Sequence, residues 1–377
     1  MICGVCATMA PAEQYLQEAL NAFDFGGEVV GAVRFGSGHI NDTFCVHTQP
    51  GEDPCRRFIL QRISRNAFHH PEQVMANIAG VTNYLKKEIA AEGGDPERET
   101  LSLCIARDGS YYHTDPEGGA WRVYPFLEDT MCLQSAETPE RFAASARAFG
   151  KFQRMLKDYP AETLYETIPH FHDTEARLAR LKEVVAADPV GRLKEVGPEL
   201  DFVAAREADC SVVLEALRRG ELPLRVTHND TKLNNVLMDR KTGEAVCVID
   251  LDTVMPGLSV NDFGDSIRFG ANHCDEDERD MNKVHFDLNL FDAYTQGFLE
   301  GADGALTPAE LDYLPWGARL ITLECGIRFL TDYLEGDKYF RIHRPGQNLD
   351  RCRTQFKLVA DMEACWDKMC SAVDKYR

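Results

Sequence analysis

One segment, residues 226–252, constrains the fold and chemistry of this chain more than any other. It starts with a strand-like Val-Thr pair, turns at a Lys-Thr-Gly sequence, and ends with a β-branched run that leads into two aspartates. Its polar residues stand at fixed spacing: His228, Asp230, Lys232, Asn235, Asp250 and Asp252. A lone His-x-Asp or strand-end Asp usually marks a turn or a cap, but this combination in strand context indicates a reaction centre.

The residue types in this segment suit phosphoryl transfer, which needs an aligned nucleophile and neutralised charge on the phosphates. Asp230 is a carboxylate that can accept a hydrogen bond from an attacking hydroxyl. Asn235 and Asp250 offer hard oxygen ligands of the kind that hold Mg²⁺ against phosphates. Lys232 can reach the transferred γ-phosphoryl, and we expect His228 to hold the backbone of the loop in place.

The same spacing resembles the kinase catalytic loop, in which Asp follows His by two residues and Asn follows Asp by five. Asp250 stands where protein kinases carry the Asp of Asp-Phe-Gly, but Leu251 and Asp252 replace the Phe and Gly. This Ile-Asp-x-Asp form resembles the aminoglycoside phosphotransferase and choline kinase superfamily. Asp252 is either a second metal ligand or a hydrogen-bonded loop residue.

The first third of the chain has the pattern of a strand-rich lobe with inserted helices. Apolar alternation and glycine-rich turns predict strands at 29–35, 43–47, 58–63, 101–106, 111–113 and 121–126. Helical spacing predicts helices at 11–23 and 73–89.

The rest of the chain is mainly helical, with short strands near residue 226 and at 245–249. Thr138 is placed to cap the first long helix, and further helices are predicted at 173–219, 286–300, 308–335 and 350–375. The fold class is therefore α+β, with a small mixed lobe and a larger helical lobe, and the resemblance to the kinase loop implies a bilobal protein-kinase-like fold. Residues 1–127 form the small mixed nucleotide-binding lobe with an antiparallel sheet, and residues 128–377 form the larger helical lobe that carries the catalytic loop and substrate site.

Two segments of the small lobe are expected to contact ATP. Glycines in the first hairpin allow the backbone to fold close over phosphates, although a plain hairpin is the alternative: Gly36, Ser37 and Gly38. From its position, the connector between the lobes is expected to bind adenine through its backbone, with an ordinary strand that enters a helix as the alternative: Pro125, Phe126 and Leu127.

The third strand departs from the kinase pattern. Kinases place a lysine there to hold the α and β phosphates, and the aligned residue here is Gln61. A shift of one residue offers Arg62 instead, but it turns the opposite face of the strand inward. We prefer Gln61, in which case metal ions carry more of the phosphate charge.

Composition limits the partners. The formal net charge is −20, and so acidic a surface repels nucleic acid and anionic lipid. No apolar run approaches the roughly 18 residues of a membrane span, and the start lacks the features of a secretory signal. Thirteen cysteines show no disulfide framework spacing, so we expect thiols in a reducing cytoplasm.

Two acidic patterns lie beyond the loop. Asp262 and Asp265 are interpreted as acceptors that brace the catalytic loop, with helix-start acids as the alternative. Glu324, Arg328 and Asp332 recur every four residues. They form either a solvated ladder of salt bridges or a wall of the substrate site.

Longer strings resemble the N-acetylhexosamine 1-kinase group of the superfamily: GSGHINDTF, FILQRI, HNDTKLNN, VIDLDTVMPG, NDFGDSIRFGAN and ITLECGIRFLTDYLEGDKYFR. The resemblance implies ATP-dependent phosphorylation of the anomeric hydroxyl of N-acetylglucosamine or N-acetylgalactosamine. It also implies sugar contacts from Asp230, Arg328, Tyr339 and His39. The rival interpretations are a kinase for choline, homoserine or an aminoglycoside, and a catalytically dead binding module.

Overall fold

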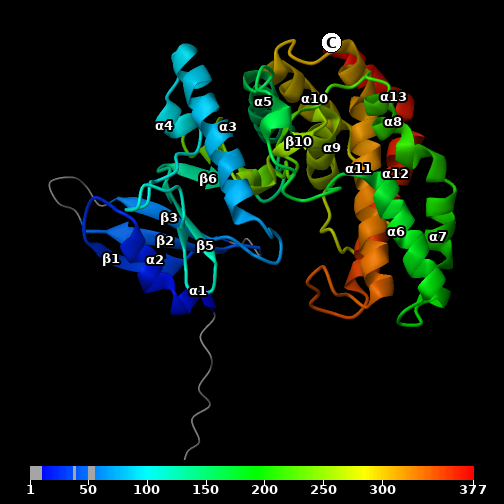
Figure 1. Cartoon of the computed structure of the whole chain (residues 1–377). Helices are drawn as coiled ribbons and strands as arrows, with labels where there is room; N and C mark the ends of the chain where they lie inside the picture. The colour runs from blue at the N-terminus through cyan, green and yellow to red at the C-terminus, as the bar shows by residue number, and fades with distance from the viewer. Residues whose placement is uncertain (1–10, 37–39, 50–55) are drawn as a thin grey trace, which may run out of the picture. The chain divides into compact units, whose positions relative to one another are not determined.

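The computed structural model describes residues 11–36, 40–49 and 56–377. The chain divides into two compact units, Met1–Glu128 and Asp129–Arg377, each with its own core (Figure 1). The boundary lies one residue from the predicted one.

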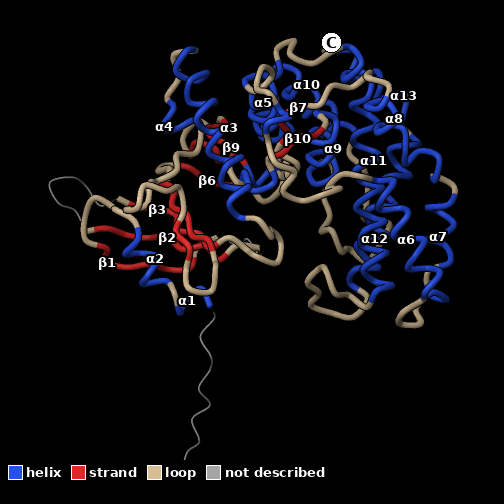
Figure 2. The backbone as a smooth tube through the Cα atoms, viewed as in Figure 1, coloured by secondary structure: helices blue, strands red, loops and turns tan. Residues whose placement is uncertain are grey.

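The smaller unit combines one sheet with short helices and a single long helix. Its elements are α1 (Pro11–Gln14), α2 (Leu16–Ala22), β1 (Val29–Arg34), β2 (Asp42–Thr48), β3 (Arg57–Arg62), α3 (Pro71–Ala91), α4 (Pro96–Glu99), β4 (His113–Thr114) and β5 (Ala120–Pro125). The five strands pair antiparallel in the order β1-β2-β3-β5-β4, drawn red in Figure 2.

Period-two alternation explains this sheet. Phe44 and Val46 of β2, Leu60 of β3 and Val123 of β5 are buried on one face, where they pack with the apolar side of α2. The predicted strand at 101–106 is wrong. That segment makes a backbone bond from Cys104 to the Val123 carbonyl oxygen (2.9 Å) and an isolated bridge at Ala106, without a continuous ladder.

The larger unit is mainly helical. Its helices are α5 (Pro139–Met155), α6 (Thr174–Ala187), α7 (Gly197–Ala204), α8 (Val212–Arg218), α9 (Ser259–Gly270), α10 (Leu288–Ala302), α11 (Pro308–Glu335), α12 (Gln347–Ala364) and α13 (Trp366–Lys375). Its strands are β6 (Thr130–Cys132), β7 (Arg225–Thr227), β8 (Val236–Asp239), β9 (Ala245–Val248) and β10 (Met255–Gly257).

Capping and close packing position these helices. The Thr138 hydroxyl accepts a hydrogen bond from the Arg141 amide, so the predicted cap of α5 is confirmed. Helices α9 and α11 cross at glycines: a Cβ on Gly317 would lie 2.0 Å from the Val260 carbonyl oxygen, and one on Gly264 2.3 Å from that of Gly317. The first turn of α9 and the middle of α11 are thereby fixed together.

Two small sheets hold the segment that contains the catalytic motif. β7 pairs with β10, and β6, β8 and β9 form the second sheet in the order β6-β8-β9. Val236 of β8 lies opposite Val248 of β9, so the residues just before β8 and just after β9 lie at the same edge.

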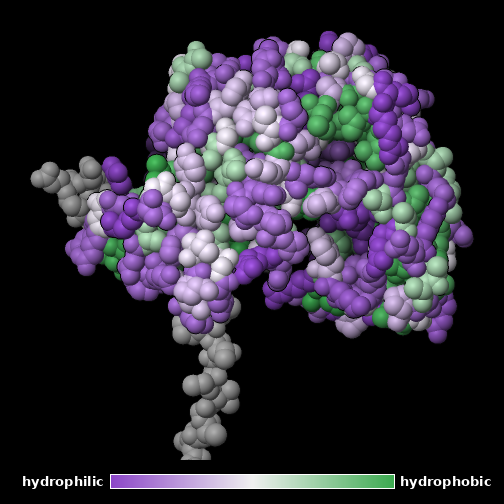
Figure 3. Space-filling model, in the orientation of Figure 1, coloured by the Kyte–Doolittle hydropathy of each residue, from purple (hydrophilic) through white to green (hydrophobic). Residues whose placement is uncertain are grey.

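The surface agrees with the composition. Hydrophilic side chains predominate on the visible face of each unit in Figure 3, as expected for a net charge of −20. In the described part of the chain, no helix is both long enough and apolar enough to cross a membrane. Every cysteine within the described residues is a free thiol.

Candidate active site

The catalytic loop begins where β7 ends. His228 is fully buried, and its Nε2 atom lies 2.8 Å from the Ile249 carbonyl oxygen while its Nδ1 atom accepts a hydrogen bond from the Asp230 amide (3.2 Å). Both ring nitrogens of His228 are therefore hydrogen-bonded to backbone groups, and Nε2 is the nitrogen that carries the proton. His228 fixes the loop against the end of β9, which is the role that the sequence predicted for it.

Asp230 lies at the centre of three predicted site residues. Lys232 Nζ is 2.8 Å from Asp230 Oδ1, and Asn235 Nδ2 donates to Asp230 Oδ2 (3.0 Å) and to the Asp230 carbonyl oxygen (2.8 Å). Burial disfavours the charged carboxylate, but the Lys232 ammonium and the Asn235 amide outweigh it, so the pKa of Asp230 is lowered. In turn the Asp230 carboxylate raises the pKa of Lys232. Asp230 is thus ionised and oriented at neutral pH.

Asp262, in the first turn of α9, braces this loop from behind. Its Oδ2 atom accepts from the His228 amide (2.9 Å) and from Gln153 Nε2 (2.8 Å), and its Oδ1 atom accepts from the Asn229 amide (2.7 Å). These bonds hold Asn229 in the left-handed conformation at φ 64°. Burial raises the pKa of Asp262 despite these donors. Asp265 does not contact the loop in this way, because its Oδ1 atom pairs with Arg268 (2.9 Å).

The residues predicted to bind metal come from the edge shared by β8 and β9. The Ile249 amide donates to the Asn235 carbonyl oxygen (2.9 Å), so Asp250 directly follows a residue bonded to Asn235. Asp250 adopts the left-handed conformation at φ 61°, and Asp252 is buried. Asn235 uses its Nδ2 atom for Asp230, which leaves Oδ1 as the oxygen of its amide that can bind a cation.

This donor set fits Mg²⁺ bound with a nucleotide. Within the described ranges no group of three His, Cys, Asp or Glu residues could hold a metal ion by itself. Such a cage is not required, because Mg²⁺ in kinase sites takes one or two protein oxygens and completes its shell with phosphates and water.

The helix α11 does not carry a ladder of salt bridges. Glu324 bonds to His172 and Thr174, and Asp332 accepts hydrogen bonds from the amides of residues 338–340 at 2.8–2.9 Å. The Arg328 guanidinium forms no ion pair among the described residues and instead faces the rings of Phe171, Tyr339 and Phe340. This arrangement leaves its donors for a ligand.

Tyr339 follows the end of α11. The residue is 72% exposed, and its ring packs against Phe340 with 4.8 Å between centroids. The structure therefore brings Tyr339 and Arg328 together, at 5.9 Å from guanidinium carbon to ring centroid. His39, the other predicted sugar contact, lies outside the described residues.

In the smaller unit, Gln61 is linked to a buried arginine. Gln61 Oε1 accepts from Arg122 Nε (3.1 Å) and Nη2 (2.9 Å), and Gln61 Nε2 donates to Thr43. Arg62 points to the other face of β3 and pairs with Asp115 at 2.8 Å. A guanidinium thus stands beside the position at which kinases carry their lysine, and it comes from β5.

The remaining predicted nucleotide contacts are placed in part. The Phe126 amide donates to the Arg57 carbonyl oxygen (3.0 Å), so it extends the sheet and is not a donor for adenine. Pro125, the last residue of β5, has no amide hydrogen, so it cannot donate to adenine either. Gly36 has φ 81°, whereas Ser37 and Gly38 lie outside the described residues.

Comparison with known proteins decides the family. Residues 31–302 match the family described as "Phosphotransferase enzyme family". The chain belongs to this family. The match includes the catalytic loop, Asp250 and Asp262, so this phosphotransferase carries the predicted constellation within the shared region.

Solved structures share the fold of this phosphotransferase. An aminoglycoside phosphotransferase from Alicyclobacillus acidocaldarius aligns with a TM-score of 0.62 at 14% identity, over 98% of each chain. A choline kinase from Cryptosporidium parvum gives 0.53 at 11% identity, over 92% of each chain. An amicoumacin kinase in complex with AMP-PNP, Ca²⁺ and Ami gives 0.52 at 13% identity, over 97% of this chain and 94% of that one. The predicted protein-kinase-like fold is confirmed.

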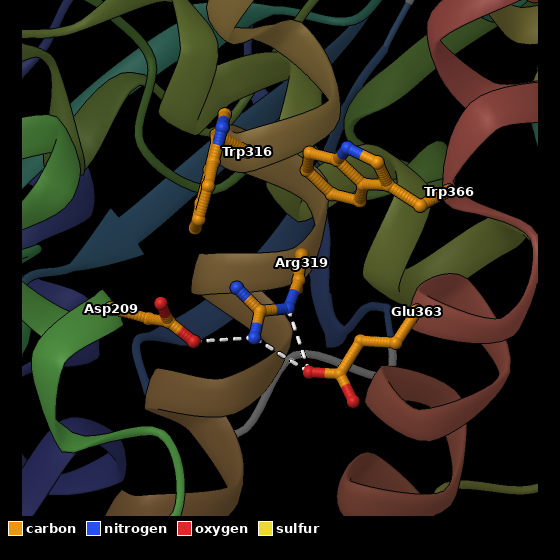
Figure 4. Close-up of a pocket in the computed structure, with 5 residues that line it drawn as sticks. All are labelled: Asp209, Trp316, Arg319, Glu363 and Trp366. Carbon is orange, nitrogen blue, oxygen red and sulfur yellow. Dashed lines mark hydrogen bonds and ion pairs between the residues drawn. The ribbon is translucent and has the colours of Figure 1, made fainter.

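A pocket of about 290 Å³ in the larger unit is separate from this constellation (Figure 4). It is lined by Asp209, Trp316, Arg319, Glu363 and Trp366. Arg319 lies between the two carboxylates and bonds to both, at 2.5 Å to Asp209 and 2.8 Å to Glu363. The charged side chains that line this pocket pair with one another. None of the predicted site residues lines the pocket.

Sequence reasoning missed two groups of this phosphotransferase. Arg122 lies in a strand with the pattern of an ordinary apolar segment, and only the pairing of β3 with β5 places it opposite Gln61. His172 precedes α6 and contacts Asn229 and Glu324, which are 57 and 152 residues away in sequence. No local pattern distinguishes either residue.

Proposed function

We propose that this phosphotransferase is an ATP- and Mg²⁺-dependent kinase that phosphorylates the C1 hydroxyl of N-acetylhexosamines. The observation that carries the proposal is the Asp230 carboxylate, held by Lys232 and Asn235 on a loop braced by Asp262. Asp230 accepts the proton of the attacking hydroxyl, and the anomeric hydroxyl is the most acidic hydroxyl of a hexose. One carboxylate base can therefore suffice.

The charge on the nucleotide is neutralised by groups around this base. Mg²⁺, when bound, draws charge from the phosphates, and Asn235 and Asp250 would hold it, with Asp252 as a further candidate. Lys232 exchanges its contact with Asp230 for the transferred phosphoryl group. In the smaller unit we assign Gly36, Ser37, Gly38 and Gln61 to the phosphates. We assign the connector at residues 125–127 to adenine, except for the Phe126 amide, which bonds to Arg57. ATP-dependent chemistry and free thiols favour the cytoplasm.

The neighbourhood of Arg328 favours a neutral, oxygen-rich acceptor over a cationic one. The Arg328 guanidinium lies against three aromatic rings. The pKa of nearby Arg177 is lowered by the burial of Arg177 and by the positive charge of Arg328. A quaternary ammonium or an aminoglycoside would meet like charge here. A sugar offers adjacent oxygens for the two parallel donors of a guanidinium, and Tyr339 and His39 complete the proposed contacts.

An acceptor panel tests the substrate class. ADP release is measured with ATP, Mg²⁺ and one acceptor at a time: N-acetylglucosamine, N-acetylgalactosamine, choline, ethanolamine, homoserine and kanamycin. We expect turnover with the two sugars alone. Turnover with a cationic acceptor instead would overturn the sugar assignment, and no turnover with any acceptor would favour a binding module.

The variant Arg328→Lys tests the sugar contact. Lysine keeps the charge but loses the planar fork, so KM for N-acetylglucosamine should rise about 10-fold or more while KM for ATP stays within about twofold. Arg341→Lys, on an exposed residue after α11, is the matched control and should change neither constant. Unchanged sugar kinetics in Arg328→Lys would remove Arg328 from the site.

A further inference from the structure

His172 joins two parts of the site that are far apart in sequence. Its Nδ1 atom lies 3.2 Å from Glu324 Oε1 on α11, and its Nε2 atom lies 3.2 Å from the Asn229 carbonyl oxygen in the catalytic loop. The side chains of His172 and Glu324 are 9% and 2% exposed. Thr174 donates to the second oxygen of Glu324 (2.7 Å), which fixes the carboxylate.

These contacts define the charge of the ring. A carboxylate and a backbone carbonyl can only accept, so both ring nitrogens of His172 must carry protons to satisfy them. Burial by itself would lower the pKa of His172, but the bond and charge of Glu324 outweigh it, and the pKa is raised. The same pair lowers the pKa of Glu324 against the effect of burial.

The two residues that His172 contacts, Asn229 and Glu324, lie close in sequence to the proposed base and to the proposed sugar contact. Asn229 immediately precedes Asp230, and Glu324 lies four residues, about one helical turn, before Arg328. The neighbouring ring of Phe171 faces Arg328 at 6.0 Å. The other charged groups that act on His172 are Asp262 and Asp265 of α9 and Arg328 of α11.

We propose that His172 is a positioning residue whose imidazolium sets the catalytic base Asp230 relative to the substrate-binding helix α11. This inference rests on the proposed function, because it gives Asp230 and α11 their roles. Above the pKa of His172 the ring keeps one proton and can satisfy only one acceptor. The loop and the helix then lose their link, and turnover falls.

The experiment compares His172→Gln, Glu324→Gln and the double variant with wild type from about pH 5.5 to about pH 9.5, a range that spans the titration of a histidine with a raised pKa. Glutamine at position 172 can donate to the Asn229 carbonyl oxygen but turns its own oxygen toward Glu324. We expect kcat at neutral pH to fall about 10- to 100-fold in His172→Gln, as for a small displacement of reacting groups. The double variant restores both bonds without charge, so it should recover most of kcat and show no alkaline decline.

The control is His170→Asn. His170 is an exposed histidine that pairs with Asp173, and its φ of 56° is one that asparagine tolerates. We expect its kinetics and pH profile to match wild type. Circular dichroism and thermal unfolding of every variant separate misfolding from misplacement.

Two readouts keep this inference distinct from the sugar assignment. ADP formation is measured with N-acetylglucosamine and, in parallel, with water as acceptor. If wild type does not phosphorylate the sugar, only the sugar assignment is contradicted. The hydrolysis of ATP, with water as the acceptor, still reports on Asp230. An alkaline limb in wild type that persists unchanged in His172→Gln, or a His172 ring that titrates below its usual pKa by NMR, would overturn the proposal.

Discussion

At the residue scale, the proposed chemistry depends on one ionised carboxylate, that of Asp230. Asp230 has neighbours that lower its pKa, so it stays charged at neutral and mildly acidic pH. A lowered pKa makes Asp230 a weak base, which suits its role in phosphoryl transfer. In the proposed mechanism Asp230 orients the hydroxyl and takes its proton late, as charge passes to the phosphoryl group.

Replacing Asp230 with asparagine removes this acceptor while keeping the shape of the side chain. We expect kcat to fall about 10²- to 10⁴-fold, with KM for ATP and the unfolding midpoint close to wild type. Stopped assays of ADP formation and nucleotide binding by calorimetry measure the two effects. Asp303→Asn, at the exposed left-handed end of α10, serves as control. Near-normal turnover in Asp230→Asn would exclude Asp230 as the base.

What the sequence predicted at this scale depended on local spacing. His228, Asp230 and Asn235 act within one loop, so their spacing in sequence carries their geometry. The partner of Gln61 is set by strand pairing, and the link through His172 reaches a helix that lies far along the chain. Physical contact of that kind leaves no trace in a single sequence.

At the element scale, α11 carries Arg328 of the proposed substrate site. Its start was predictable because Thr307 and Glu310 form a capping box with Pro308 at the first position, and its end because Gly336 adopts φ 96°. The prediction of a strand at 101–106 was wrong because its residue pattern does not distinguish a strand from another extended segment. β-Branched and apolar residues are also compatible with an extended segment that crosses a sheet edge with a single ladder bond.

Asp332 ties the end of α11 to the loop that carries Tyr339. Its carboxylate accepts three backbone bonds and one from Asn348, so Asp332→Ala should lower the free energy of unfolding by about 2–4 kcal/mol. Urea unfolding measures this loss. Asp312→Ala removes an exposed ion pair from the same helix and should cost under about 1 kcal/mol. Equal effects would show that the Asp332 bonds are replaced by water.

At the scale of the whole molecule, an acidic chain must bind a polyanionic nucleotide. A net charge of −20 opposes this association unless cations intervene, and the described residues supply oxygen ligands without a complete metal cage. Activity should therefore vanish with excess EDTA and return on adding Mg²⁺, measured as ADP formation. Full activity after chelation would contradict the assignment of Asn235 and Asp250.

The position of the phosphate on the product tests the proposed anomeric kinase activity most directly. N-acetylglucosamine is converted with ATP and Mg²⁺, and the purified product is analysed by proton–phosphorus correlation NMR. We predict a coupling from phosphorus to the anomeric proton, and about 100-fold or more slower formation of this product by Asp230→Asn under the same conditions. A coupling to the C6 protons, or a product that forms equally without Asp230, would contradict the assignment of Asp230 as the base of an anomeric kinase.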